Sequence, residues 1–499
     1  FGVDKAIASI SGAPSPDQAF LLESKVGQAA AKCSRCLASY LRCSQRSASS
    51  GSPIKVELLS ALVRALRDKD VTLAQDIDHG LSLGIDRPLE PTGLFPPYSH
   101  HDQASALERF HLGIRANYKS VEMNQAVTER LIEEEVRLNR MHTGQSLLSR
   151  YRLVEDYKRN GLNEAMHPVE TVSLPALADL QRVTQDFLYT LSLVPGDLPR
   201  PPVVPGAPVL PTDSQVEALT PTFTSFDISS AFRHLFMCSA DRFRLSTSVN
   251  GRSFEHRAMP FGTKVAPYHW CRLGACIGRL QRELLHRLLN GVPHAFLLYV
   301  DDGLLLLPKY VSALAASVSL VLWCSLGVSL SWKKCQFNLG TIDYIGYRLS
   351  VTCDDCTIQI KPGTLEKARV SLRNLVTSST CTPQSVATVT GRLLFATQVA
   401  PFLRSFLQPL YSLLHIFDSR RLRVLHLSSS SRALEVARFW LEVVNGDRLR
   451  LPVLANSRRI PLASRSHLIV ASDASLLGIG AFAAFPDGAG YYISQAISP

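Results

Sequence analysis

The chain has 499 residues, with 53 lysines and arginines against 42 aspartates and glutamates, which gives a formal net charge of +11. Hydrophobic residues make up 46% of the chain, beside 28 glycines and 29 prolines. This composition is ordinary for globular protein and excludes collagen-like, mucin-like and wholly disordered chains. At roughly 150 residues per domain, the length predicts about three domains. The excess positive charge indicates a polyanionic partner.

Cysteine usage favours a reducing environment. The chain has 11 cysteines, an odd number scattered along the sequence, which argues against a disulfide framework and for an intracellular setting, in the cytoplasm, the nucleus or both. No signal-peptide pattern opens the chain, and its first residue, Phe1, is not methionine. We therefore expect a fragment of a longer polyprotein.

One uncharged segment, residues 310–332, is long enough to cross a membrane. Six of its residues are serine, and Gly327 interrupts it. A buried helix followed by a strand explains the same segment better. We therefore predict no membrane association.

The first hundred residues, 1–100, are loosely patterned and their role is not indicated by the sequence. Cys33 and Cys36, with Cys43 nearby, have the spacing of part of a zinc site, but a fourth ligand is missing at any usual spacing. Free thiols on a helical segment are the favoured interpretation. Apolar residues at helical spacing predict helix over 103–149, and a strand is expected at 151–157.

Residues 194–211 contain seven prolines, which predicts an extended surface insertion. From residue 223 to 349, short apolar strands alternate with helix-length segments, so we predict an α+β domain. Residues 362–445 are typical of helix. A strand-rich segment begins at residue 466 and ends with the chain at residue 499.

The strongest local signal is the sequence AFLLYVDDGLLLL at 295–307, in which two apolar runs flank Asp301, Asp302 and Gly303. It predicts a hairpin of two buried strands with the aspartates at the turn. Asp-Gly is an ordinary turn signal, but it does not explain adjacent carboxylates in such apolar sequence. Burying them costs several kcal/mol unless a cation compensates.

A second strand-like run, residues 223–232, contains Asp227. Three carboxylates from two strands can hold two Mg²⁺ ions roughly 4 Å apart, with Mn²⁺ as a substitute. Such a site suits nucleotidyl transfer, in which positioning and charge neutralisation supply most of the rate.

These motifs resemble the three central palm motifs of reverse transcriptases: FDISSAF with Asp227, MPFGTKVAP at 259–267, and YVDD at 299–302. Further similarity covers YRLVEDYKRNGLN before the palm, LGVSLSWKKCQF after the hairpin, YIGY at 344–347, and HLIVASDASLLGIGAF at 467–482. The last resembles the first strand of an RNase H domain. The usual Lys-Lys-Asp-Gly turn before the fingers arginine is absent, and Arg150 is the candidate to replace its lysine.

The resemblance implies a right-hand polymerase of fingers, palm and thumb with an antiparallel palm sheet, followed by a truncated RNase H-like α/β domain. We expect the N-terminal region at 1–100, fingers and palm at 101–350, a helical thumb and connection at 351–460, and the RNase H-like start at 465–499. Because only one RNase H carboxylate, Asp473, precedes the chain's end, RNase H activity is not expected from this chain.

The resemblance also implies roles for individual residues. Asp227, Asp301 and Asp302 would bind the metal ions, and Lys334, or the adjacent Lys333, would protonate the leaving pyrophosphate. The incoming nucleotide would be bound by Arg152 at the triphosphate, by Phe232, which would exclude a 2′-hydroxyl, and by Phe261 and Gly262 against the base. The primer and template would contact Tyr299, Tyr344, Gly346 and Tyr347.

We therefore predict an RNA-directed DNA polymerase of a retroelement, whose partners are an RNA template, a DNA primer or product, dNTPs and the remaining polyprotein domains: the rest of RNase H, and a recombinase or integrase. The thumb-like sequence at 391–410 favours a DIRS- or VIPER-like element over an LTR retrotransposon or pararetrovirus. The alternative is a catalytically silent, domesticated copy that only binds nucleic acid. An RNA-templated RNA polymerase is a third alternative.

Overall fold

The chain forms two compact units, Phe1–Leu454 and Ala455–Pro499, in this computed structural model. The structure describes residues 1–97, 125–141, 157, 161–192, 217–249, 252–353, 355–378, 380–428, 431–446, 449–454, 469–474, 478–484 and 490–496. The proline-rich segment 194–211 lies outside the described residues, as do nearly all of the strand predicted at 151–157 and much of the helix predicted at 103–149.

Four helices form the N-terminal region: α1 (Val3–Ala8), α2 (Pro16–Leu41), α3 (Val56–Ala65) and α4 (Leu73–His79). At the start of α2, Gln18 N donates to Ser15 Oγ (3.2 Å) and Ser15 N donates to Gln18 Oε1 (2.9 Å). This capping box satisfies backbone donors that the helix leaves unpaired. Cys33 and Cys36 lie on α2, so the helical segment expected there is confirmed.

A four-stranded antiparallel sheet, in the order β4-β5-β1-β6, lies at the centre of the first unit. Its strands are β1 (Pro221–Asp227), β4 (Ala295–Tyr299), β5 (Asp302–Pro308) and β6 (Gln336–Leu339). Every residue of β5 after Asp302 is buried, so its sequence is a continuous apolar run instead of an alternating one. The predicted antiparallel sheet and the hairpin that carries the aspartates are confirmed.

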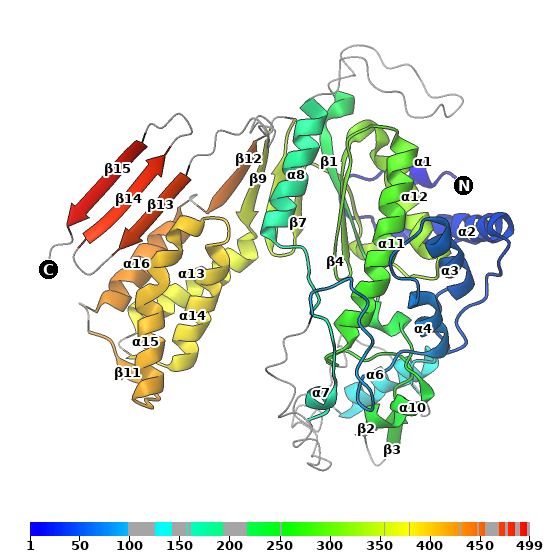
Figure 1. Ribbon diagram of the computed structural model, residues 1–499, viewed down its shortest axis with the longest axis horizontal. Coiled ribbons are helices and arrows are strands. Elements are labelled where there is room, and N and C mark those ends of the chain that lie inside the picture. The colour runs from blue at the N-terminus through cyan, green and yellow to red at the C-terminus, as the bar shows by residue number, and fades with distance from the viewer. Residues whose placement is uncertain are drawn as a thin grey trace. The chain divides into compact units, whose positions relative to one another are not determined.

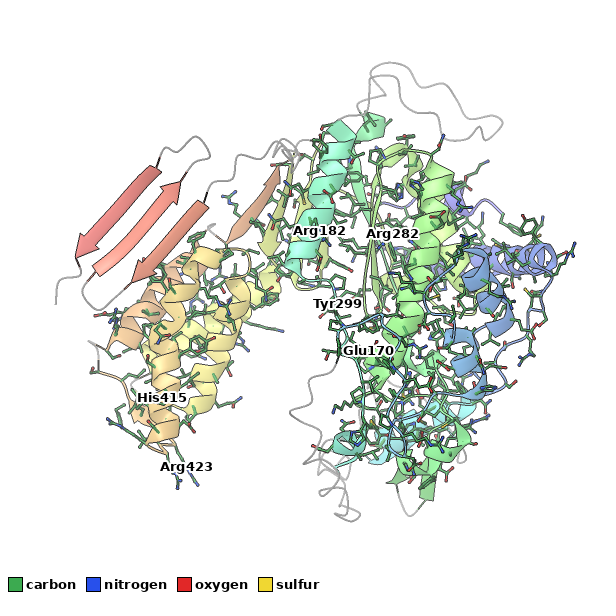
Figure 2. The ribbon with its side chains drawn as sticks, viewed as in Figure 1. Glu170, Arg182, Arg282, Tyr299, His415 and Arg423 are labelled. Carbon is green, nitrogen blue, oxygen red and sulfur yellow. The ribbon has the colours of Figure 1, made fainter. Side chains whose placement is uncertain are left out.

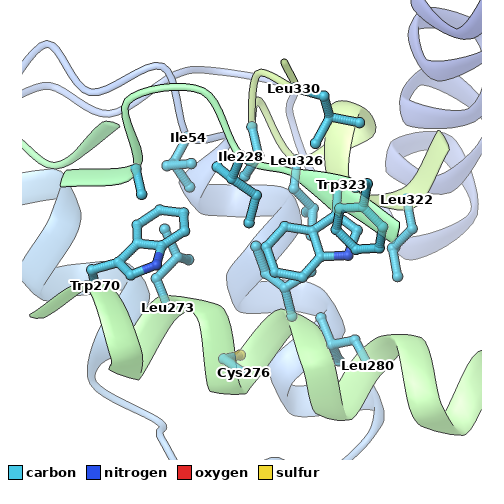
Figure 3. Packing of buried hydrophobic residues seen from close by; sticks show 14 of the residues in the cluster. Ile54, Ile228, Trp270, Leu273, Cys276, Leu280, Leu322, Trp323, Leu326 and Leu330 are labelled. Atoms are coloured by element: carbon cyan, nitrogen blue, oxygen red, sulfur yellow. The ribbon is translucent and has the colours of Figure 1, made fainter. Parts of the chain in front are cut away.

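Two long helices, α11 (Ala266–Leu289) and α12 (Lys309–Ser325), run along this sheet (Figure 1). Figure 3 shows Trp270 and Leu273 of α11 in the same apolar cluster as Trp323 of α12 and Ile54 of the N-terminal region. Helix α12 occupies most of the uncharged segment 310–332, which is therefore part of the core. Among the described residues, no helix combines the length and apolarity of a membrane span.

The N-terminal region packs into the same core as the central sheet. Gly12 N donates to Phe337 O (2.8 Å) and Phe337 N donates to Gly12 O (3.0 Å), which extends the sheet beyond β6. On the α11 side, the buried Arg272 guanidinium pairs with Asp70 at 2.8 Å and with Asp76 at 2.9 Å. These contacts make residues 1–85 an integral layer of the first unit.

Shorter elements lie between the N-terminal helices and α11 in the sequence. They are α6 (Gln125–Arg137), α7 (Leu162–Ala165), α8 (Leu177–Ser192), η3 (Ala231–His234), α10 (Ser239–Arg242), η4 (Phe243–Leu245), β2 (Ser246–Val249) and β3 (Arg252–Glu255). Arg233 of η3 forms an ion pair with Glu135 of α6 at 3.0 Å. This pair connects α6 to the segment that follows β1.

A second antiparallel sheet, in the order β12-β9-β8-β7, adjoins a helical bundle. Its strands are β7 (Thr341–Tyr344), β8 (Tyr347–Val351), β9 (Asp355–Ile360) and β12 (Arg450–Leu454). The bundle contains α13 (Pro362–Thr377), α14 (Pro383–Ala396), η6 (Pro401–Leu407), α15 (Gln408–Ser419) and α16 (Arg432–Asn445), with β10 (Thr380–Cys381) and β11 (Leu425–His426) as a short pair. Helices at 362–445 were predicted.

The second unit contains an antiparallel sheet of three strands in sequence order. They are β13 (Ile469–Ala474), β14 (Gly478–Ala484) and β15 (Gly490–Ala496). Asp473 lies on β13, opposite Gly480 of β14.

Candidate active site

The register of the central sheet brings the three predicted aspartates together. Asp227, the last residue of β1, is the register partner of Asp302, the first residue of β5. Asp301 precedes it in the turn after β4, and Ile228 N donates to Asp301 O at 2.9 Å. The carboxylates of two strands therefore meet at one end of the sheet, as the sequence predicted.

The tight turn consists of Val300 and Asp301, because Tyr299 and Asp302 form the pair that closes the hairpin. Val300 has φ 54°, a left-handed conformation that is costly for a β-branched residue. Gly303 is not a turn residue. A Cβ there would lie within 2.7 Å of carbons of the Phe226 ring, so glycine is required by close packing between β5 and β1.

Burial raises the pKa of Asp302 to about 6, and repulsion from Asp301 and then from Asp227 adds to the rise. The cause is electrostatic crowding: three acidic groups share a partly desolvated site. A bound cation would remove this penalty, and hard carboxylate oxygens are the ligands that Mg²⁺ and Mn²⁺ prefer. The donor chemistry therefore fits a divalent metal site.

Lys334 supplies the positive charge nearest to Asp227. Its Nζ lies 2.9 Å from Oδ1 and 2.8 Å from Oδ2 of that carboxylate. The lysine ends η5 (Trp332–Lys334), and Ser331 N donates to Asp227 O at 2.8 Å, which holds this segment beside β1. Among the described residues, no three His, Cys, Asp or Glu side chains are arranged to hold a metal ion. In this arrangement the ammonium of Lys334 is the counter-ion of Asp227.

Two aromatic rings contact each other, one on the segment after β1 and one on the MPFGTKVAP motif. The ring centroids of Phe232 and Phe261 are 5.3 Å apart. Gly262 has φ 96° and is exposed. Asn163 connects this motif to α7. Its Nδ2 donates to Gly262 O and its Oδ1 accepts from Lys264 N, both at 2.8 Å.

The sequence did not single out Asn163 as a site residue, although it lies in the predicted fingers motif. Its side chain binds two backbone groups about one hundred residues away. The only available signal was its place in YRLVEDYKRNGLN. Such a long-range contact has no local pattern.

The YIGY turn joins β7 to β8. Tyr344 and Tyr347 are 4% and 2% exposed, and both hydroxyls bond inside the protein: Tyr344 Oη to Asp302 O at 3.0 Å, and Tyr347 Oη to Gln398 Oε1. Gly346, with φ 90°, lies against the Phe395 ring. The side chains of both tyrosines are therefore buried inside the protein and not available for the predicted contact with a primer. Tyr299, labelled in Figure 2, is half-buried at the end of β4.

Two predicted site residues cannot be placed in the same way. Arg152, like Arg150, lies outside the described residues. For Asp473 the structure describes the strand, β13, but not the side chain.

Comparison with known proteins gives one family match. Residues 123–349 match the family model described as "Reverse transcriptase (RNA-dependent DNA polymerase)". The chain is also similar to the retrovirus-related Pol polyprotein from transposon gypsy of Drosophila melanogaster, with 26% identity over 130 residues. That alignment covers 26% of this chain, and the chain spans 12% of the length of that relative.

Among solved structures, the chain is similar to the foamy viral protease-reverse transcriptase. The structure with double-stranded DNA has a TM-score of 0.46 at 14% identity and covers 78% of this chain and 58% of that one. The structure with an RNA/DNA hybrid has a TM-score of 0.45 at 15% identity and covers 88% and 52%.

Proposed function

We propose that this chain is an RNA-directed DNA polymerase of a retroelement, which extends a primer on an RNA or DNA template by nucleotidyl transfer. The observation that carries the proposal is the register of β1 against β5, which pairs Asp227 with Asp302 beside Asp301. The site lies inside the span that matches the reverse transcriptase family. The gypsy Pol polyprotein relative supports a retroelement origin.

In this proposal Asp227, Asp301 and Asp302 hold two Mg²⁺ ions, or Mn²⁺ in their place. Bound there, such ions lower the pKa of a primer hydroxyl and neutralise charge on the leaving pyrophosphate. The protein's own contribution is to bring the three carboxylates together at the ends of two paired strands.

Lys334 is the proposed general acid for the pyrophosphate. Its ammonium lies within 2.9 Å of both oxygens of Asp227, so a proton donor stands directly beside a metal-binding group. This contact favours Lys334 over Lys333 for the role.

Phe232 is proposed to exclude ribonucleotides by a clash with their 2′-hydroxyl, and Phe261 with Gly262 to support the base. The contact between the two rings supports this assignment, because it fixes Phe232 from one side. The proposed role of Arg152 at the triphosphate, and those of Tyr299 and of the Tyr344–Tyr347 turn at the primer, rest on the sequence motifs.

The second unit is proposed to be the start of an RNase H-like domain with Asp473 as its first carboxylate; its three-stranded antiparallel sheet supports this. A DIRS- or VIPER-like subtype, an intracellular location, and partnership with dNTPs and further polyprotein domains belong to the same proposal. All 11 cysteines are free, which supports a reducing location.

The test is primer extension by the purified chain on an oligo(dT)-primed RNA template with dNTPs and Mg²⁺. We expect extension by the native chain and a loss of at least about a thousandfold in Asp301→Asn, because metal coordination supplies several kcal/mol. Asp17→Asn, at an exposed position on α2, is the matched control and should extend normally. Template binding without extension by the native chain would instead indicate a domesticated nucleic-acid-binding copy.

A further inference from the structure

Three consecutive backbone carbonyls in the aspartate turn each accept a hydrogen bond from a different element. Val300 O accepts from Trp270 Nε1 of α11 at 2.7 Å. Asp301 O accepts from the backbone N–H of Ile228, after β1, at 2.9 Å. Asp302 O accepts from Tyr344 Oη of β7 at 3.0 Å. The two side-chain donors come from elements outside the hairpin.

The turn needs such support for two reasons. Val300 has φ 54°, a conformation that persists only where the surroundings enforce it. The turn also carries two adjacent carboxylates, Asp301 and Asp302, and the second of them is the register partner of Asp227. A hydrogen bond to each carbonyl restricts rotation of the peptide planes from which the carboxylates project.

Both side-chain donors are buried. Trp270 is fully buried and Tyr344 is 4% exposed. Trp270 lies in the apolar cluster drawn in Figure 3. Tyr344 ends β7, one strand of the second sheet. Donors fixed in this way can set the position of an acceptor group instead of following it.

We propose that Trp270 and Tyr344 are positioning residues: through the turn's carbonyls they restrict the backbone from which the metal-binding side chains of Asp301 and Asp302 project. The inference rests on the proposed polymerase function and adds two residues to it. Neither side chain contacts a carboxylate in this role: Trp270 acts through Val300, and Tyr344 acts through the Asp302 backbone.

Tyr344→Phe and Trp270→Phe remove the donors and keep an aromatic ring. Each has a matched control that loses an equivalent buried hydrogen bond away from the turn. Tyr268 Oη donates to Glu170 Oε2 at 3.2 Å, with Glu170 labelled in Figure 2, and the buried Trp440 Nε1 of α16 donates to Phe406 O at 3.5 Å. Tyr268→Phe and Trp440→Phe should therefore remove a buried hydrogen bond without loosening the aspartates.

The experiment measures Mn²⁺ binding to the full chain by calorimetry without substrate, and primer extension in parallel. We expect Tyr344→Phe and Trp270→Phe to weaken Mn²⁺ binding and lower kcat, each by about tenfold, with the KM for dNTP unchanged within about twofold. The two controls should keep the native Mn²⁺ affinity. Asp301→Asn should abolish Mn²⁺ binding at the aspartates, which distinguishes this ion from Mn²⁺ bound elsewhere on the chain.

Native Mn²⁺ affinity in both test variants, or an equal loss in the controls, would overturn the positioning role. So would a native chain whose Mn²⁺ binding is unaffected by Asp301→Asn. If the native chain binds Mn²⁺ in the expected pattern but extends no primer, the polymerase proposal fails while the positioning role stands.

Discussion

Asp302 shows how one residue can be arranged for chemistry at the expense of stability. Its pKa rises from 3.8 to about 6 in the folded chain, so the folded state binds the proton more tightly than the unfolded state. Proton binding to Asp302 therefore stabilises the folded state. This stabilisation is fully present below pH 3.8 and is lost as the pH rises through about 6. When no cation is bound, ionised Asp302 therefore lowers the free energy of unfolding.

We accordingly expect Asp302→Asn to stabilise the metal-free protein at pH 8 by about 1–2 kcal/mol, after allowing for solvent screening. At pH 4.5 the gain should be much smaller, because most of the native Asp302 is then protonated. Thermal or denaturant unfolding at both pH values measures the gain in stability, with Asp17→Asn as the control. An equal gain at both pH values would show that the buried charge of Asp302 is not the source of the destabilisation.

Phe232 allows a second test at this scale. Phe232→Ala should raise the relative use of NTP over dNTP, measured as the ratio of their kcat/KM values, by at least about tenfold. The exposed Phe243→Ala is the control, since Phe243 is 59% exposed. An unchanged ratio in Phe232→Ala would favour the RNA-templated RNA polymerase that the sequence left open.

At the scale of elements, the hairpin of β4 and β5 depends on the close packing of Gly303 against Phe226. The Phe226 ring is stacked on Phe296 at 6.2 Å between centroids and packs on Trp323 at 5.9 Å, so it has little freedom to move aside. Gly303→Ala should destabilise the chain by about 1–3 kcal/mol through overpacking.

Adding Phe226→Leu should recover part of that loss, because the shorter side chain leaves room for the new methyl group. Urea unfolding of the two single variants and the double variant measures the coupling energy. Strictly additive losses would show that the two positions do not compete for space.

The hairpin also shows what the sequence could and could not predict. Two apolar runs around Asp301 and Asp302 were enough to predict the strands and the turn, because strand patterns are local. The meeting with Asp227 was expected from a second strand-like run that contains an acidic residue and from the resemblance to the palm motifs. The Asp-Gly turn signal does not explain Gly303, which lies in β5 and is required by a ring on another strand. The donors Trp270 and Asn163 were not recognised, because each acts on a segment distant in the sequence.

At the scale of the whole molecule, residues 1–85 belong to the first unit. The sequence pattern indicated no role for residues 1–100, because a helix that docks on a distant sheet looks like any amphipathic helix. The buried pair of Arg272 with Asp70 illustrates what removal of the N-terminal region would cost. Removing one partner of such a pair destabilises a protein by about 3–5 kcal/mol.

A pair of truncations tests this division. A chain of residues 1–454 should keep the thermal transition of the full chain and its primer extension, because Ala455–Pro499 is a separate unit. A chain of residues 101–499 should be insoluble or lack a cooperative transition, because deletion exposes the apolar core. Calorimetry and solubility measure both, and a folded 101–499 chain would contradict the integral role of the N-terminal layer.

The contacts of the N-terminal layer have a consequence during synthesis. Asn338 Nδ2 donates to Ile7 O (3.1 Å) across 331 residues of sequence, so α1 is made long before its partner emerges from the ribosome. At typical rates of about 5–20 residues per second, the delay is about 20–60 s. During that interval the surfaces of α1 and α2 that pack on α12 lack their partner, and the nascent chain is a natural client for chaperones.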